Sequence, residues 1–571
     1  MRYFIDAYRS GKFITLWHKE NGLNVRTTEL YRSSIYVELS GESILKKLGI
    51  NFTRVSKRTH LGKVINVLCV RVPSGMFERV VKRIEPSSKH AIKLYNADIA
   101  PEQYFMYEKR LRPFVGEEAI TLHRCRVSLT CTKEEITSLM LNEKAFIGDE
   151  REVLESFVSA FLEEDPDVIL MKRAFSHIPF IASRMEHHKI SCPFHRWDKR
   201  PIRYRGGKSF HSYGQVRFKD FAVRLNGRFL VDSGSTVGEV CDVEGIMELS
   251  ELTGARFQQV ASRSFGSIFQ QSLLREMVED DVLIPHKEKP VDMPMSLMDM
   301  VKGDRAGHTF DPKKGFHQDV AEIDFSSMFP WLIYNHNISS EMLASKKEPL
   351  EQVPGLPITI SHAKKGYVPR AIKSLLDKRM YYKDHPTCIN RKRAAGIKWV
   401  LVTSYGYLRF REFKLGVATS HMAICAYARQ TIIDAAKMAE ERGFQVIHGI
   451  VDCLYIKKKG IQEDEVRLLC DEIKKRFSIP TCFEGIFKWI TFLPSVVDAH
   501  RPLPSSYFGA YATGRYKARG IELRRRSTPI VVKEFQEHTL DVFSNCNSRK
   551  AIRGGSVKYK YPLRVTIVLY E

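Results

Sequence analysis

The chain has 571 residues, of which 43% are hydrophobic and 11% are aromatic. This length exceeds the size at which a single core stops growing, so we expect about three or more packed domains, and the apolar content excludes a disordered chain. Lys and Arg number 90 against 66 Asp and Glu, which gives a net charge of +24. Such an excess favours a polyanionic partner such as nucleic acid, although a ribosome-associated protein would carry the same bulk charge.

The 11 cysteines include no Cys-x-x-Cys pair, and we interpret them as reduced core residues of an intracellular protein. The N-terminal segment MRYFIDAYRSGK has no apolar signal core, and no apolar run approaches the length of a membrane span. We therefore expect a soluble, intracellular, cytoplasmic protein with no membrane partner.

Residues 1–115 alternate short strand-like runs, such as SIYVEL and VINVLCVRV, with amphipathic helical patterns. Residues 116–290 contain the strand-like RCRVSLTCT, the helical REVLESFVSAFLEE and the buried-strand pattern DVIL, which together indicate a second domain with β, α, β order. A stretch rich in Pro, Met and Asp, PHKEKPVDMPMSLMDM, follows and is expected to be a linker.

The first segment that carries candidate catalytic residues is VAEIDFSSMFPWLIYNHNIS. In this segment a strand is expected to end at Asp324, and Pro330 suits the first turn of a helix. A carboxylate at a strand end, followed by the backbone amides of a helix start, can hold a divalent cation and a triphosphate side by side. A helix-capping aspartate is the structural alternative for this segment alone.

The second segment contains two helical patterns that flank a turn at Pro386, so we expect an antiparallel helix pair. Arg379 lies on the first helix, and Lys398 and Tyr405 share one face of the second because they are seven residues apart. Two basic helical faces would suit the charges of a nucleoside triphosphate, whereas an ordinary solvated basic helix would show the same stripe.

The third segment, FQVIHGIVDCLYIKKK, predicts an apolar strand, a tight turn at His448-Gly449 and a second strand that carries Asp452. A carboxylate within so apolar a stretch is costly unless it is paired or bound to a metal. Metal binding is the hypothesis that we favour, and structural burial with a basic partner is the alternative.

Taken together, these segments resemble motifs A, B and C of the family-B DNA polymerases, in the order of that family. DFSSMFP is similar to D-x-x-S-L-Y-P, KWVLVTSYG to K-x-x-x-N-S-x-Y-G, and HGIVDCLYI to Y-G-D-T-D-S. KKGYVPRAIKSLLDKR resembles the first fingers helix, FEGIFKW a strand of the palm, and RYKARGIELRRRSTP the stretch that enters the thumb. LYNADIAPEQYFMYEKRLRP resembles the end of the N-terminal domain, so the likeness extends over nearly the whole chain.

The resemblance implies an α/β and α+β multidomain fold. We expect a right-hand polymerase with palm, fingers and short thumb, preceded by an N-terminal domain and an RNase H-like exonuclease-type domain. The expected boundaries are 1–115 for the N-terminal domain, 116–290 for the exonuclease-type domain, 291–360 and 406–500 for the palm, 361–405 for the fingers and 501–571 for the thumb.

The resemblance also implies roles for single residues. Asp324 and Asp452 match aspartates that bridge two Mg²⁺ ions, for which Mn²⁺ is an expected substitute, and Phe325 and Glu484 are the further expected metal ligands. Lys398 matches a lysine that contacts the triphosphate and donates a proton to the departing pyrophosphate.

Other matched positions concern the nucleotide and the DNA. Arg379 matches an arginine that grips the triphosphate, and Phe329 matches a ring that excludes a ribose 2′-OH, so deoxynucleotides should be preferred. Tyr405 matches a residue beneath the nascent base pair. The remaining expected contacts are Ser327 and Met328 with the nucleotide, and Gly406, Tyr507, Arg524, Arg525 and Arg526 with DNA.

The chain departs from the family pattern at several of these motifs. Motif C has Ile450 in place of its first aspartate, and motif B has Val402 in place of an asparagine, so we expect slow or low-affinity synthesis. Glu322 is two residues before Asp324 on the same strand face and could supply another oxygen ligand. The thumb motif retains Tyr507 but loses its lysine.

The exonuclease motifs are more strongly altered. Ser128-Leu129-Thr130 replaces the first acidic motif, His177 takes the place of the second-motif aspartate, and Asp242 alone matches the third. One carboxylate cannot hold the two cations that this chemistry needs, so proofreading should be absent. These losses resemble the divergent second family-B paralogue of archaea, DNA polymerase 2, more than a protein-primed polymerase.

Two hypotheses of different class follow. The first is an active DNA-directed DNA polymerase of low fidelity that serves replication or repair by translesion synthesis, extending primers across damaged template. Its expected partners are primer–template DNA, deoxynucleotides, and a sliding clamp or another replication or repair protein. The second is a catalytically dead polymerase fold that binds DNA as a scaffold or regulator.

Overall fold

The structure is a computed structural model. It describes residues 2–87, 92–116, 120–197, 201–205, 208–212, 215–219, 222–288, 290–410, 412–495, 497–525 and 527–547. The chain divides into two compact units. One comprises residues 1–291 and 366–416, and the other comprises residues 292–365 and 417–571. In the described part of the chain, no helix combines the length and apolar character that crossing a membrane would require.

The first unit begins with a three-stranded antiparallel meander and continues into a five-stranded sheet of order β17-β5-β6-β4-β7. The short strand β17 (Val282–Leu283) lies near the end of the expected exonuclease-type domain but pairs with β5 of the expected N-terminal domain. The predicted boundary at residue 115 therefore does not separate the two domains into independent sheets. The elements are β1 (Arg2–Ser10), β2 (Phe13–Glu20), β3 (Leu23–Leu30), β4 (Arg32–Glu38), α1 (Glu42–Lys47), β5 (Thr53–Thr59), β6 (Val64–Pro73), α2 (Phe77–Ser87), β7 (Leu94–Tyr95), α3 (Pro101–Glu108) and β17 (Val282–Leu283).

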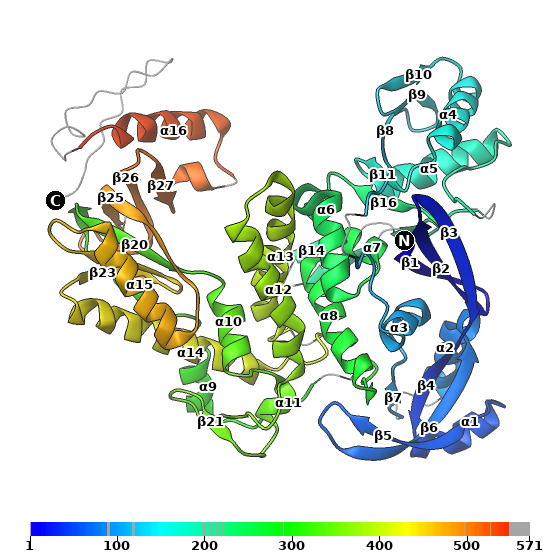
Figure 1. Ribbon diagram of the computed structural model, residues 1–571, viewed down its shortest axis with the longest axis horizontal. Coiled ribbons are helices and arrows are strands. Elements are labelled where there is room, and N and C mark those ends of the chain that lie inside the picture. The colour runs from blue at the N-terminus through cyan, green and yellow to red at the C-terminus, as the bar shows by residue number, and fades with distance from the viewer. Residues whose placement is uncertain are drawn as a thin grey trace. The chain divides into compact units, whose positions relative to one another are not determined.

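A second sheet of the same unit has the order β10-β9-β8-β11-β16 (Figure 1). Its strands β8, β9 and β10 are antiparallel, and β11 runs parallel to both β8 and β16. The buried-strand pattern DVIL is confirmed as β11. The elements are β8 (Arg124–Cys131), β9 (Ile136–Leu141), β10 (Lys144–Ile147), α4 (Glu150–Glu164), β11 (Val168–Met171), α5 (Ala174–His187) and β16 (Phe229–Asp232), with the short strands β12 (Arg203–Arg205), β13 (Lys208–Ser212), β14 (Gln215–Lys219) and β15 (Ala222–Arg224).

Helices complete this unit, and the expected helix pair around Pro386 is present as α12 and α13. Helix α13 packs against α6, α8 and α12. A Cβ atom at Gly396 would lie 2.9 Å from the Cys241 sulfur, so the glycine permits the close approach of α13 to α6. The helices are α6 (Thr236–Thr253), α7 (Phe257–Ala261), α8 (Phe265–Glu279), α12 (Tyr367–Asp384) and α13 (Cys388–Tyr407).

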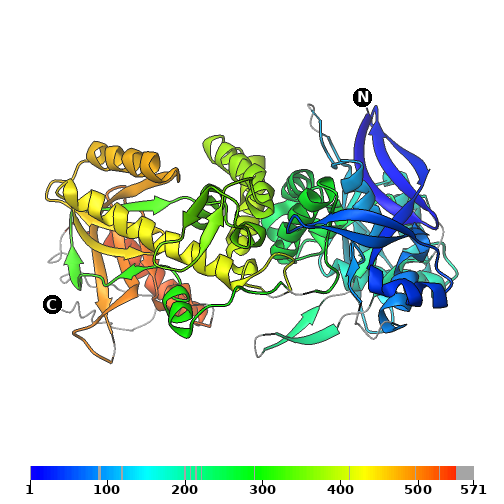
Figure 2. The same ribbon diagram turned by 90° about the horizontal axis from the view of Figure 1, so that it is seen from below.

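The second unit is built on one antiparallel sheet of order β18-β23-β24-β20-β25-β26-β27, with β19 paired to β25 (Figure 1). Helix α14, yellow in Figure 2, packs against β23 and β24, α15 packs against β25, and α16 packs against β26 and β27. The strands are β18 (Thr309–Phe310), β19 (Gly315–His317), β20 (Val320–Phe325), β23 (Gln445–Ile450), β24 (Cys453–Lys457), β25 (Thr481–Pro494), β26 (Pro502–Tyr511) and β27 (Tyr516–Arg519), with the hairpin β21 (Leu350–Gln352) and β22 (Thr359–Ser361).

Two expected boundaries differ from the structure of this unit. The sheet continues through β27 to Arg519, because Tyr507 to Ala510 pair with β27, so the palm does not end at residue 500. Residues 406–416 belong to the first unit rather than to this one. The helices are α9 (Leu297–Gly303), α10 (Met328–Asn335), α11 (Ser340–Leu343), α14 (Ala418–Glu441), α15 (Glu463–Phe477) and α16 (Ile530–Ser544).

Candidate active site

The end of strand β20 carries Asp324. This strand is central in its sheet, because β24 pairs with one edge and β25 with the other. Asp324 is therefore opposite Cys453 on one side and Cys482 on the other. Ser327 then adopts a left-handed conformation with φ 57° and caps α10, which begins at Met328. The strand end, turn and helix start that the sequence predicted are all present.

Asp452 lies in the two-residue turn between β23 and β24, not on the second strand as predicted. The predicted turn at His448-Gly449 is also wrong, because both residues lie within β23, where a Cβ atom at Gly449 would be 2.7 Å from the Phe310 ring. The Asp452 backbone amide donates to the Ile450 carbonyl at 2.5 Å, and the intervening Val451 has φ 52°. An i to i+2 hydrogen bond around a positive φ is the strained form of the γ-turn, and a β-branched residue rarely adopts it. The Asp452 carbonyl accepts from the Phe325 amide at 2.8 Å, which fastens this turn to the end of β20.

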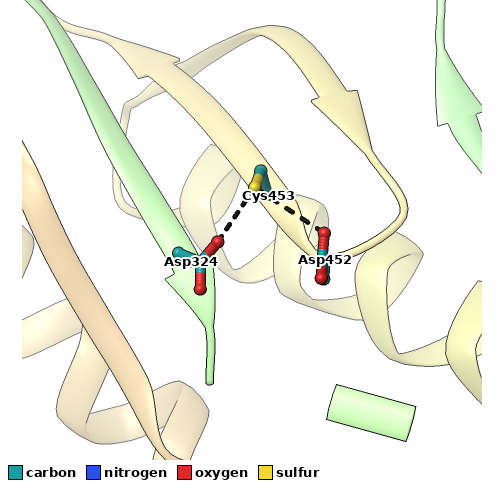
Figure 3. Close-up of side chains that lie close together, drawn as sticks. All are labelled: Asp324, Asp452 and Cys453. Carbon is teal, nitrogen blue, oxygen red and sulfur yellow. Dashed lines mark hydrogen bonds between the residues drawn. The ribbon is translucent and has the colours of Figure 1, made fainter. Parts of the chain in front are cut away.

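Asp324, Asp452 and Cys453 form one cluster (Figure 3), in which a potential ligand atom of each lies within 4.8 Å of the others. The Cys453 thiol donates to Asp324 Oδ2 at 3.0 Å and lies 3.7 Å from Asp452 Oδ1. Among the described residues, no second group of three metal-ligating side chains lies together in this way. Asp324 and Asp452 are thus close to each other, as the prediction requires, and their binding of metal stays a prediction.

The two carboxylates repel each other in a half-buried position. Burial, followed by the nearby charge of Asp324, raises the pKa of Asp452 to about 6. Burial and the same two carboxylates raise the pKa of the Cys453 thiol. Both effects reflect burial first and the neighbouring negative charge second. A divalent cation would neutralise that charge, and carboxylate oxygens are the donors that Mg²⁺ and Mn²⁺ take. The residues present thus fit a divalent cation.

Glu322 does not join this cluster, and the hypothesis that it supplies another metal ligand is wrong. The side chain is fully buried, and Tyr455 donates to its Oε1 at 3.0 Å. Tyr511 donates to the other oxygen, and the Lys517 ammonium pairs with the carboxylate. Both oxygens are already engaged, so Glu322 joins β20 to β24, β26 and β27 and has a structural role.

The comparisons with known proteins now give the family. The model of DNA polymerase family B matches residues 257–557. The chain belongs to this family. DNA polymerase 2 of Saccharolobus solfataricus is 28% identical over 372 residues, which cover 60% of this chain and 56% of that protein. A DNA polymerase of Archaeoglobus fulgidus is 23% identical over 456 residues, covering 72% and 57% respectively. The chain thus spans little more than half the length of either relative.

The fold agrees with this assignment. The structure of the family B DNA polymerase from Pyrobaculum calidifontis matches with a TM-score of 0.70 and 17% sequence identity, and the match covers 97% of this chain and 85% of that one. DNA polymerase 2 of Aeropyrum pernix is also similar, with 24% identity over 305 residues that cover 51% of this chain and 35% of that protein. The expected mixed α/β multidomain fold is confirmed.

Two of the positions expected at the site of this family B chain fall outside the metal cluster. Glu484 is exposed, and the nearest charged partner is Arg515, at 3.9 Å. Tyr507 is only 3% exposed, and its hydroxyl lies 2.7 Å from that of Tyr455, which argues against the predicted DNA contact. The Phe325 side chain is buried, so only the backbone of this residue could reach a metal.

The expected triphosphate contacts lie in the first compact unit, on α12 and α13. Arg379 is half-buried on α12. Lys398 is exposed on α13, and Val402 follows it one turn later, also exposed. Tyr405 is half-buried, and Gly406 is exposed near the end of the same helix. The two predicted basic helices are confirmed, whereas the contacts themselves remain predictions.

The other expected contacts lie in the second unit. Met328 is buried and Phe329 half-buried in the first turn of α10. Arg524 is exposed, and Arg525 forms an ion pair with Glu522 at 2.6 Å. Arg526 lies outside the described residues.

The residues at the expected exonuclease motif positions lie on β8, α5 and α6. Ser128 and Thr130 are on β8, and His177 is on α5. Asp242 interrupts α6 with φ 54°, and its Oδ1 accepts from the following amide, Val243, at 2.8 Å. Within the described part of the expected exonuclease-type domain, no three metal-ligating side chains come together.

Cys453 is the residue that reasoning from the sequence missed. It stands where motif C has a serine, directly after Asp452. Its position opposite Asp324 follows from the pairing register of β20 and β24, which the sequence alone does not give.

Proposed function

We propose that this chain is a DNA-directed DNA polymerase that adds deoxynucleotides to a primer 3′ end by two-metal nucleotidyl transfer. The observation that carries the proposal is the meeting of Asp324 and Asp452 at one point of a family B fold. Two bridging carboxylates are the minimum for this chemistry, and a protein that only binds DNA has no physical need to hold them in a strained turn.

Asp324 and Asp452 would hold the divalent cations, and the backbone of Phe325 lies next to them. When bound, such ions supply Lewis acidity to the primer hydroxyl and to the departing pyrophosphate. The raised pKa of Asp452 means that this carboxyl must lose its proton before it can bind a cation. Mg²⁺ is the proposed ion and Mn²⁺ the substitute.

The triphosphate would be held by Arg379 and Lys398, with Lys398 as the proton donor to pyrophosphate. Phe329, beside Ser327 and Met328 at the start of α10, would pack against the deoxyribose and exclude a 2′-hydroxyl. Arg524 and Arg525, with Gly406 and Tyr405 on α13, are proposed to contact the primer–template DNA. The net charge of +24 supports a nucleic-acid substrate.

The proposed polymerase does not proofread. The positions of its first two exonuclease motifs hold Ser128, Thr130 and His177, and the carboxylate of Asp242 accepts from its own neighbouring amide. Loss of proofreading and the missing motif C aspartate support slow, low-fidelity synthesis, which would suit extension across damaged template. Such an enzyme would act in the cytoplasm at the nucleoid, with a sliding clamp or another replication or repair protein as partner.

A second candidate function is a DNA-binding scaffold without catalysis. Ile450 supports it, because this residue packs into the apolar cluster around Tyr455 at the position where the family has a carboxylate. The retained pair of Asp324 and Asp452 supports the polymerase more strongly, since either aspartate alone would be a cost to the fold.

The deciding experiment is extension of a labelled primer on a defined template, with Mg²⁺ or Mn²⁺, beside the variant Asp452→Ala. We expect template-directed extension by the wild-type chain and none by the variant. Tight binding of the primer–template without any extension would contradict the polymerase and leave the scaffold as the function.

A further inference from the structure

The sulfur of Cys453 takes part in the carboxylate cluster at the place where a third carboxylate is missing. Ile450, which replaces that carboxylate, is the cross-strand partner of Cys453 in the β23–β24 hairpin. Cys453 in turn is the cross-strand partner of Asp324. Directly opposed residues of antiparallel strands present their side chains on the same face of the sheet. The three positions therefore form a row across β23, β24 and β20.

The orientation of Cys453 is fixed by the residues that follow it. Tyr455, two residues later on the same face, donates a hydrogen bond to the buried Glu322 at 3.0 Å. Leu454, between them, lies on the opposite face of the strand, because successive side chains alternate between the two faces. A one-residue slip of β24 would break the Tyr455 contact, so the pairing holds the Cys453 sulfur toward Asp324.

We propose that Cys453 is itself a metal ligand, and that this mixed oxygen and sulfur site binds borderline-soft divalent cations such as Co²⁺ or Zn²⁺ in preference to Mg²⁺. The proposed function and this metal preference share one site, the cluster of Asp324, Asp452 and Cys453, and the preference rests on the proposed function in that respect alone. The sulfur lies 3.0 Å from one Asp324 oxygen and 3.7 Å from one Asp452 oxygen, so one ion can contact all three side chains.

The chemistry of the donors gives the direction of the preference. Thiolate sulfur favours softer cations such as Zn²⁺, whereas Mg²⁺ requires a near-octahedral set of oxygen ligands. On binding, the metal–sulfur bond replaces the S–H bond, and the proton leaves to solvent. A serine, which the family motif has at this position, would offer a weaker oxygen donor and no such preference.

Titration with Co²⁺ tests the proposal, because a thiolate bound to Co²⁺ produces a near-ultraviolet charge-transfer band that oxygen ligands do not. The variant is Cys453→Ser, and the matched control is Cys482→Ser. Cys482 also faces Asp324 from the neighbouring strand, but its sulfur contacts Ser326 Oγ at 3.2 Å and lies outside the cluster.

We expect the band in the wild-type chain and in Cys482→Ser, and its loss in Cys453→Ser. Affinity for Co²⁺ and Zn²⁺ should fall by at least roughly tenfold in Cys453→Ser, as loss of a group that supports a metal commonly costs, while affinity for Mg²⁺ should not fall. Co²⁺ binding to the wild type without the band, or a band that survives in Cys453→Ser, would overturn the proposal.

A second measurement needs no variant and so does not depend on folding of a mutant. Alkylation of each cysteine in the wild-type chain is followed by mass spectrometry with and without Zn²⁺. Zn²⁺ should slow modification of Cys453 and leave the exposed Cys131 and Cys388 unaffected. Equal rates at Cys453 with and without Zn²⁺ would overturn sulfur ligation. Failure of primer extension with every metal would overturn the polymerase alone, because neither readout here requires synthesis.

Discussion

Two strands of this molecule end in aspartates that have different surroundings. At the end of β20, Asp324 meets Asp452 and the Cys453 thiol. At the end of β16, Asp232 instead accepts hydrogen bonds from the backbone amides of Arg173, at 3.0 Å, and Gly234, at 2.9 Å. The first carboxylate stands beside another carboxylate that it repels, whereas the second is satisfied by its own backbone. An aspartate near a strand end is thus close to a second carboxylate in one unit, as a cation site would require, whereas in the other unit it holds the loop through backbone hydrogen bonds.

The comparison shows that the fold and the chemistry of a domain depend on different residues. The sheet that contains β8, β11 and β16 has a continuous apolar core that includes Leu139, Phe157 and Ile178. Under the proposed function, the positions of its first two exonuclease motifs hold Ser128 and His177, and the core is complete without carboxylates there. Burial maintains the sheet, whereas a metal site needs its carboxylates individually. A retained fold is therefore poor evidence for a retained activity.

The largest expected effect is on primer extension, when the aspartate near each of the two strand ends is replaced by asparagine. Asp324→Asn should reduce primer extension by about a thousandfold or more, because metal assistance to phosphoryl transfer contributes several kcal/mol and each 1.4 kcal/mol is about tenfold. Asp232→Asn, the matched change at the other strand end, keeps an oxygen acceptor and should leave extension within about twofold. Steady-state extension rates measure both variants. Equal losses would show that Asp324 acts through folding rather than through metal binding.

The next effect concerns a carboxylate that the structure assigns to the fold. Glu322→Gln should lower the free energy of unfolding by about 3–5 kcal/mol, because it leaves the Lys517 charge without its buried partner. Urea unfolding monitored by fluorescence or circular dichroism gives this value. Tyr455→Phe removes the hydrogen bonds of this hydroxyl with Glu322 and with Tyr507 but leaves the ion pair intact, and it should cost less, about 1–2 kcal/mol. A Glu322→Gln variant of unchanged stability but weakened metal binding would make Glu322 a ligand after all.

A smaller effect lies in the exonuclease-type domain, at Glu150. Hydrogen bonds from Arg184 lower the pKa of this carboxyl to about 2, against burial, with further help from His188 and the Ile136 amide. Because the folded pKa is below the unfolded value of about 4.3, the stabilisation is present above that value and is lost as the pH falls toward 2. Glu150→Gln should cost about 1.5–3 kcal/mol at neutral pH.

The pH dependence supplies the control for this prediction. Unfolding free energies of the wild type should approach those of Glu150→Gln as the pH is lowered from about 6 to about 3. A constant difference across that range would mean that Glu150 stabilises the domain by packing rather than by its charge. The exposed pair of Glu155 with Arg151, on the same helix, offers a comparison that should show almost no such trend.

The sequence predicted the parts of the site that depend on local pattern. The strand end at Asp324 and the helix pair that carries Arg379 and Lys398 follow from short-range periodicity and turn residues. The turn of the hairpin was predicted at His448-Gly449, three residues too early, because Gly449 lies inside β23 and is not a turn residue. Contacts that depend on pairing between strands far apart in the sequence could not be predicted. Tyr511 and Lys517 reach Glu322 from β26 and β27, nearly two hundred residues along the chain.

Domain boundaries were the weakest part of the prediction for the same reason. The short β17, at Val282–Leu283, joins a sheet whose other strands all lie before residue 96. Strands β26 and β27 extend the sheet of β20 past residue 500. Neither pairing leaves a signal in local composition, because hydrogen bonds between strands form between backbones.

The smallest predicted effect sharpens the comparison by restoring the motif C carboxylate. Ile450 is the cross-strand partner of Cys453, so an aspartate there would face the cluster from a third strand. Ile450→Asp should raise Mg²⁺ affinity about tenfold, a gain of about 1.4 kcal/mol from an added oxygen ligand, and should raise extension in Mg²⁺ to a similar degree. Calorimetric titration with Mg²⁺ and extension rates measure the two. Ile450→Asn adds an oxygen without the charge, and if it gave the same gain, the effect would come from polarity at the turn rather than from a restored carboxylate ligand.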